Sequence, residues 1–91
     1  MKFMLTFAFA PQTRDEAIIR FRKTGGQPPA GAKLLARSTA ADFSRGYALL
    51  ESDDTKALTE FSLAWSDVVQ LQVVPVLEDS ELNDALRRAA R

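Results

Sequence analysis

The chain contains no cysteine and no histidine among its 91 residues. Without cysteine it cannot form a disulfide, a thiolate nucleophile or a zinc–thiolate site. Without histidine it lacks the commonest general base near neutral pH and the commonest transition-metal ligand. Its acidic residues cluster only at expected helix starts, at positions 53–54 and 78–79, where helix capping explains them. We therefore expect neither a metal site nor a bound cofactor.

An excess of one charge is also missing, because 12 acidic residues balance 12 basic ones. Nucleic-acid binding normally requires a basic excess, since phosphate neutralisation supplies much of the affinity. No segment approaches the roughly 20 apolar residues that span a bilayer, and the apolar start is too short for a signal peptide. These absences predict a cytoplasmic protein with no nucleic-acid partner and no membrane contact.

One pattern is repeated along the chain: an apolar strand, an amphipathic helix and a second strand. It runs once from Lys2 to Thr39 and again from Arg45 to Leu77. This order predicts an α+β fold, a ferredoxin-like βαββαβ sandwich with helices on one face of a four-stranded antiparallel sheet. A chain of this length forms one domain, which we expect to span residues 1–91. The strands are expected at 2–10, 33–39, 45–52 and 68–77.

Capping residues and apolar stripes predict the helices. Thr13 and Glu16 fit a capping box before the first helix, and Gly25 is typical of a helix end. Asp53 or Asp54 can cap a second helix, whose apolar stripe ends at Trp65. We expect Trp65 to pack in the core. The glycine-rich segment 25–31 does not have the spacing of a phosphate-binding loop, so we interpret it as a crossover connection.

A third helix is expected at the C-terminus, capped by Asp79 or Ser80. Its apolar stripe consists of Leu82, Ala85, Leu86 and Ala89. Its last turn is basic and suits the negative end of the helix dipole, through Arg87, Arg88 and Arg91. We interpret these arginines as a solvated helix end rather than as a site for an anionic partner.

Right-handed crossovers place both internal helices on one side of the sheet, so its other face is left open. Alternation along the first and last strands assigns to this open face Met4, Thr6, Ala8, Gln70, Gln72, Val74 and Val76. Two such faces can pair and enclose a cleft, which predicts a homodimer. The competing outcome is a monomer whose C-terminal helix folds over the open face.

Several sequence blocks resemble a known family. They are Met1-Lys2-Phe3-Met4, residues 13–17, Thr24-Gly25-Gly26-x-Pro28-Pro29-x-Gly31, Lys33-Leu34-Leu35-x-Arg37, residues 44–51, 63–67 and 74–76. In this order they resemble the bacterial domain-of-unknown-function 3303 family. The resemblance covers nearly the whole chain. It implies a ferredoxin-like domain of the dimeric α/β-barrel kind and a homodimer, and it carries over no catalytic residue.

The first functional hypothesis is a module that binds a small organic molecule, neutral or anionic, in a cleft at the paired sheet faces. Such sites combine apolar walls with a few polar groups. The residues that we expect to line the cleft are Thr6, Arg37, Tyr47, Glu51, Gln70 and Gln72. The register of the two middle strands stays open. Counting outward from a loop centred near Asp42 places Arg37 roughly opposite Tyr47, and Arg37 meets Glu51 only if a bulge shifts the hairpin register. If Arg37 has no carboxylate partner, its guanidinium can bind an anionic ligand in bidentate fashion.

Two other classes stay open. One is a cofactor-independent enzyme of the isomerase or oxygenase kind, an analogy with other dimeric α/β-barrels. Without histidine, its acid or base would be Asp42, Glu51, Asp67 or Tyr47. The other class is a domain that serves only in protein assembly.

Overall fold

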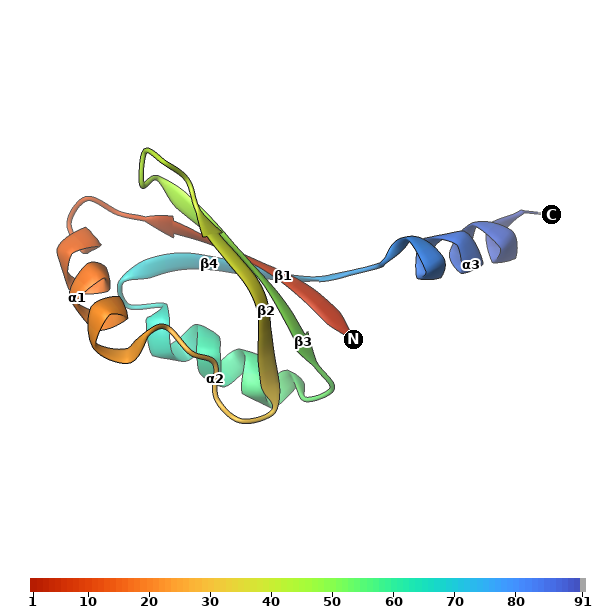
Figure 1. Ribbon diagram of the computed structural model, residues 1–91, viewed down its shortest axis with the longest axis horizontal. Helices are drawn as coiled ribbons and strands as arrows, with labels where there is room; N and C mark the ends of the chain where they lie inside the picture. Colours follow the sequence, from red (N-terminus) through yellow and green to blue (C-terminus); the bar gives the residue numbers. More distant parts are fainter. Residues whose placement is uncertain (91) are drawn as a thin grey trace.

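The computed structural model describes residues 1–90 and has the predicted ferredoxin-like order of elements (Figure 1). Their bounds are β1 Lys2–Phe9, α1 Arg14–Thr24, β2 Ala32–Thr39, β3 Arg45–Ser52, α2 Thr55–Trp65, β4 Val69–Val76 and α3 Asp79–Ala89. The strands form one antiparallel sheet in the order β2-β3-β1-β4. Figure 1 shows α1 and α2 on one side of this sheet, while α3 extends away from it. The predicted α+β fold is therefore confirmed.

Two of the predicted helix ends are confirmed by local contacts. Gly25 adopts a left-handed conformation with φ 73°, and its N–H donates to the Phe21 carbonyl at 2.7 Å, which ends α1. Asp54 caps α2, because its carboxylate accepts a hydrogen bond from the Lys56 N–H at 3.0 Å.

The capping box predicted for α1 is wrong. Thr13 is the N-cap residue, yet its hydroxyl donates to the Val68 carbonyl at 2.7 Å and accepts no capping hydrogen bond from the helix N–H groups. Glu16 instead lies 3.8 Å from Arg20. At α3 the cap is Glu78, one residue before the predicted pair, and its N–H donates to the Glu81 carboxylate at 3.1 Å. A long-range contact with Val68, the residue before β4, therefore takes precedence over local capping at Thr13.

The core lies between the sheet and α2. Its main cluster of buried side chains consists of Phe3, Leu5, Ala48, Leu50, Leu58 and Phe61. These side chains come from the central strands β1 and β3 and from one face of α2. Alternate positions of β1 therefore face the helices, as the sequence pattern predicts. Trp65 is partly buried and packs against this cluster, as predicted.

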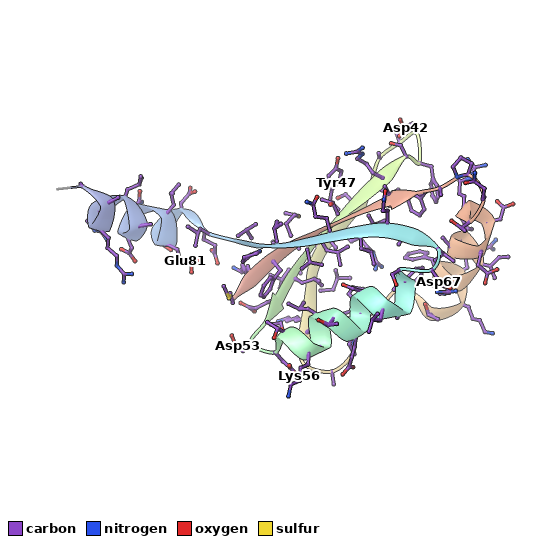
Figure 2. All side chains as sticks on the ribbon, turned by 180° about the vertical axis from the view of Figure 1, so that it is seen from behind. Asp42, Tyr47, Asp53, Lys56, Asp67 and Glu81 are labelled. Carbon is purple, nitrogen blue, oxygen red and sulfur yellow. The ribbon has the colours of Figure 1, made fainter. Side chains whose placement is uncertain are left out.

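By contrast, α1 is held mainly by polar contacts at one end of the sheet. Ala17 is its one buried residue. Arg20 binds the Asp67 carboxylate in bidentate fashion, with N–O distances of 2.7 and 2.8 Å, and also donates to the Ala64 carbonyl at 2.7 Å. Figure 2 shows Asp67 at the turn that leads from α2 into β4, close to α1. These contacts anchor α1 without packing its whole apolar face on the sheet.

The third helix buries no residue at all. It follows β4 after two residues and extends the molecule to 52 Å along its longest axis (Figure 1). Leu82 and Leu86 of its apolar stripe are 44% and 57% exposed. The structure therefore does not show the monomeric outcome considered above, in which α3 folds over the open face of its own sheet. Arg91, assigned above to the basic end of this helix, lies outside the described residues.

None of the helices within residues 1–90 combines the length and the apolar character needed to cross a membrane.

Candidate functional site

The helix-covered side of the sheet contains an apolar cavity of about 240 Å³. It lies between α1, α2, the sheet and the loop that joins β2 to β3. The chain has eight aromatic residues, counted as six Phe, one Tyr and one Trp. Six of them line this cavity, namely Phe7, Phe9, Phe21, Phe43, Phe61 and Trp65. This concentration of aromatic side chains around one space makes the cavity the strongest candidate for a functional site.

Small residues of β3 leave room for the cavity and for its aromatic wall. Ala48 lines the cavity and is 2% exposed. Gly46 lies opposite Phe7 in the sheet, and a Cβ atom on Gly46 would lie 2.2 Å from the Phe7 Cζ. The Phe7 ring therefore occupies the place of the missing side chain, and this position accepts only glycine without a rearrangement.

Phe43 closes the cavity from the β2–β3 loop. Its ring stacks on Phe9, with ring centres 4.3 Å apart. Phe43 has a φ of 60°, a left-handed conformation that is unfavourable for a residue with a large side chain. The neighbouring Asp42 carboxylate accepts hydrogen bonds from the Ser44 N–H and hydroxyl, which lower the pKa of Asp42 and fix the turn. The loop thus holds Phe43 over the cavity despite the strain.

Arg37 is the one charged residue in the cavity lining. Its Nη1 donates to the Gly26 carbonyl at 2.7 Å and its Nη2 to the Gly25 carbonyl at 2.9 Å. Its guanidinium carbon lies 4.8 Å from the centre of the Phe21 ring, a cation–π contact. Partial burial lowers the pKa of Arg37, since desolvation disfavours the charged form. Within residues 1–90 no carboxylate forms an ion pair with it.

The carbonyl groups of the glycine-rich loop after α1 therefore bind the Arg37 guanidinium. Gly26 has a φ of 61°, and a Cβ atom there would lie 2.7 Å from the Arg37 Nη1. Only glycine allows the backbone to approach the guanidinium so closely. The loop and Arg37 together form one edge of the cavity.

Comparison with protein-family models matches residues 1–90 to the Domain of unknown function (DUF3303). The chain belongs to the DUF3303 family. The match confirms the resemblance found in the sequence blocks and assigns no ligand or reaction to the DUF3303 domain. A search of the curated proteins found no match.

The open face of the DUF3303 domain collects most of the residues predicted to line a cleft. Thr6 lies between Tyr47 of β3 and Gln72 of β4, and Ala8 lies opposite Gln70. Glu51 lies farther along the same face, opposite both Lys2 and Lys33. Figure 2 shows Tyr47 pointing away from the side of the sheet that carries α2.

Arg37 does not join these residues, because it points to the helix-covered side. It lies opposite Ala48, one residue from the approximate expectation, and Ser38 lies opposite Tyr47. A register shift between Leu34 and Ala36 accompanies this arrangement. Arg37 and Glu51 do not meet either, since Glu51 lies opposite Lys33.

The other acidic candidates have structural partners outside the cavity. Asp67 binds Arg20, whose guanidinium lowers the pKa of that carboxyl group. Asp42 fixes the loop turn beside Phe43. Within residues 1–90, no group of three or more His, Cys, Asp or Glu residues is placed to hold a metal ion.

Sequence reasoning missed the cavity and its aromatic lining. Helical periodicity places Phe21 on the apolar stripe of the first helix, and Phe43 falls in the connection between the second and third strands, so neither position indicates a shared cavity. One signal was available: Phe43 is a large apolar residue in a five-residue loop, between the polar residues Asp42 and Ser44. An aromatic side chain in such a loop indicates packing against a distant element, although the sequence does not tell which one.

Proposed function

We propose that this domain binds a small organic molecule with an apolar body in the cavity beneath α1. The observation that carries the proposal is the cavity of about 240 Å³ lined by six aromatic side chains. Ligand sites are typically concave and mostly apolar, with a small number of polar groups that fix orientation. Arg37 and the Thr39 hydroxyl are such groups here.

The size of the cavity sets the class of ligand. An engineered apolar cavity of about 150 Å³ binds benzene. A space of about 240 Å³ therefore suits a substituted single ring or a short branched chain. The lining contains no carboxylate and no phenol, so its residues support binding more directly than acid–base chemistry.

The single tryptophan provides a direct test, because Trp65 lines the cavity. The neutral probe 4-ethylbenzamide is expected to change the Trp65 fluorescence in a saturable manner. At ten times its dissociation constant it should stabilise the fold by about 1.4 kcal/mol, which raises the melting temperature by several degrees.

A matched pair of variants separates cavity binding from surface binding. Ala48→Leu adds bulk inside the cavity, whereas Ala64→Leu adds the same bulk at an exposed position of α2. We expect Ala48→Leu to weaken probe binding at least tenfold and Ala64→Leu to leave it unchanged. A fluorescence change that does not saturate, or equal binding by both variants, would contradict the proposal.

We also propose that the domain forms a homodimer through its open sheet face, with α3 as part of the interface. The face exposes Tyr47 and Val74 at 42% and 41%, beside the partly buried Met4 and Leu49. Four strands of eight residues make roughly 500 Å² in projection. A standard interface buries about 800 Å² per partner, so the sheet face alone is small. The leucines of α3 supply further apolar surface.

Charge also favours a second copy as the partner of α3. The first half of the helix is acidic, with Asp79, Glu81 and Asp84, and its last turn carries Arg87 and Arg88. Two such helices packed antiparallel bring each acidic half against a basic end. An isolated helix of 11 residues is marginal in water, so packing on a partner would stabilise it.

A further inference from the structure

We infer that the ligand of the cavity is a monocarboxylate whose acid group binds the Arg37 guanidinium; this inference rests on the proposed function. The cavity then recognises two parts of one molecule. Its aromatic walls hold the apolar body, and its one charged edge holds the carboxylate.

The first step is the charge balance around Arg37. Other basic groups of the domain have carboxylate partners: Arg20 binds Asp67, and Lys2 contacts Glu78. Arg37 is more buried than a surface arginine, yet it has no such partner within residues 1–90. Burial of an unpaired charge is unfavourable, so an anion that neutralises it gains binding energy.

The backbone contacts of Arg37 do not supply that neutralisation. The Gly25 and Gly26 carbonyls lie at the C-terminal end of α1, where the helix carries about half a negative charge. They therefore orient the guanidinium and offset only part of its charge. A full negative charge on a ligand completes the balance.

Arg37 also keeps hydrogen-bond donors for a ligand. A guanidinium has five N–H groups. One N–H of each terminal nitrogen is used by the two carbonyls, so three remain, including the one on Nε. Nε and a terminal nitrogen together match the two oxygens of a carboxylate.

The guanidinium is held in place before a ligand arrives. Phe21 lies against one of its faces, and the two carbonyl contacts fix its direction. Little side-chain entropy is then lost on binding, which favours affinity. The rest of the cavity lining is uncharged, so a second acid group on the ligand would be buried without a partner. The class is therefore a monocarboxylate with an aromatic ring or a short branched chain.

The test uses two probes of the same shape, 4-ethylbenzoate and the neutral 4-ethylbenzamide, measured by titration calorimetry at pH 7. The wild-type protein is expected to bind the benzoate roughly tenfold to a hundredfold more tightly, the range typical of a hydrogen bond to a charged group. Arg37→Met is expected to remove this preference, so that the variant binds the benzoate and the amide with similar affinity. The matched control is Arg22→Met, an exposed arginine of α1 that should leave both affinities unchanged.

The outcomes separate this inference from the proposed function. Equal affinities of the wild-type protein for both probes, or a benzoate preference that survives Arg37→Met, would overturn the carboxylate inference while cavity binding stands. Binding of neither probe by the wild-type protein would overturn both. If Arg37→Met loses its circular dichroism signature of folding, Arg37→Lys replaces it. Lysine keeps the charge without the planar fork, and it should reduce the preference severalfold.

Discussion

At the scale of single residues, two glycines decide where the large side chains of the site can lie. Gly26 makes room for the Arg37 guanidinium, and Gly46 makes room for the Phe7 ring. The reasons for glycine differ at the two positions. Gly26 has a positive φ, whereas at Gly46 a side chain would collide with the Phe7 ring. Phe7 in turn packs edge-on against Phe9, with ring centres 5.5 Å apart. Replacement of Gly46 should therefore displace Phe7 and, through it, the packing of Phe9.

We predict that Gly46→Ala destabilises the fold by about 1–3 kcal/mol, the usual cost of inserting a methyl group into a packed core. The new Cβ would lie 2.2 Å from the Phe7 Cζ, so the ring has to move toward the cavity. Urea denaturation measures the change. In a Phe7→Leu background, where the ring is absent, the same substitution should cost less than half as much. An equal cost in both backgrounds would show that the ring is not the obstacle.

At the scale of elements, the position of α1 depends on contacts between residues far apart in the sequence. Arg20 and Asp67 are 47 positions apart, and Thr13 and Val68 are 55 apart. The chain pattern predicts α1 and its end at Gly25, because these follow from local signals. It does not predict that α1 buries only Ala17 and leaves a cavity beneath it. The cavity exists because of where α1 lies relative to the sheet, and the residues of α1 alone do not determine that position.

The same contrast applies to the strands. The bounds of β3 agree with the predicted range 45–52, since alternation and turn residues determine them locally. The register of β2 was not predictable, because Leu34, Leu35 and Ala36 are all apolar and suit either face. The register shift at this point determines which face Arg37 occupies. For this reason the open-face residues of β1 and β4 were predicted, whereas the place of the charged cavity residue was not.

We predict that acid weakens the fold partly through Asp67. Its pKa in the folded protein is lower than its ordinary value, because Arg20 donates hydrogen bonds to the carboxylate. A lowered folded pKa means that the unfolded chain binds the proton more readily. The contribution is therefore present above about pH 4 and is lost as the pH falls through the folded pKa.

Asp67→Asn removes this titration and retains the depressed pKa of Asp42, which serves as an internal reference. Urea midpoints between pH 6 and pH 2 should fall less steeply for Asp67→Asn than for the wild-type protein. Because Arg20 and Asp67 anchor α1, the variant should also bind the cavity probe more weakly at pH 7. Parallel pH profiles would contradict the role given to this ion pair.

At the scale of the whole molecule, two exposed surfaces belong to different elements and have no partner within residues 1–90. The open face lies behind the cavity, on the other side of the sheet, so a second copy can cover it without blocking the ligand site. The helix α3 extends beyond the sheet and is joined to it by Leu77 and Glu78 (Figures 1 and 2). Glu78 contacts Lys2 at the start of β1, beside the point where α3 leaves the sheet. The homodimer proposal accounts for both surfaces at once.

We predict that sedimentation equilibrium at micromolar concentration gives a mass near twice the 10.1 kDa of the chain. The double variant Leu82→Glu, Leu86→Glu should be monomeric, because it places charges on the apolar stripe of α3. Leu63→Glu is the matched control, since Leu63 is 70% exposed on α2 and lies outside both surfaces. It should remain dimeric.

A monomeric wild-type protein would refute the homodimer. A double variant that stays dimeric would leave the sheet-face contact and remove α3 from the interface. In that case Gln72→Glu, which adds a carboxylate to the edge strand β4 on the open face, should still separate the two copies.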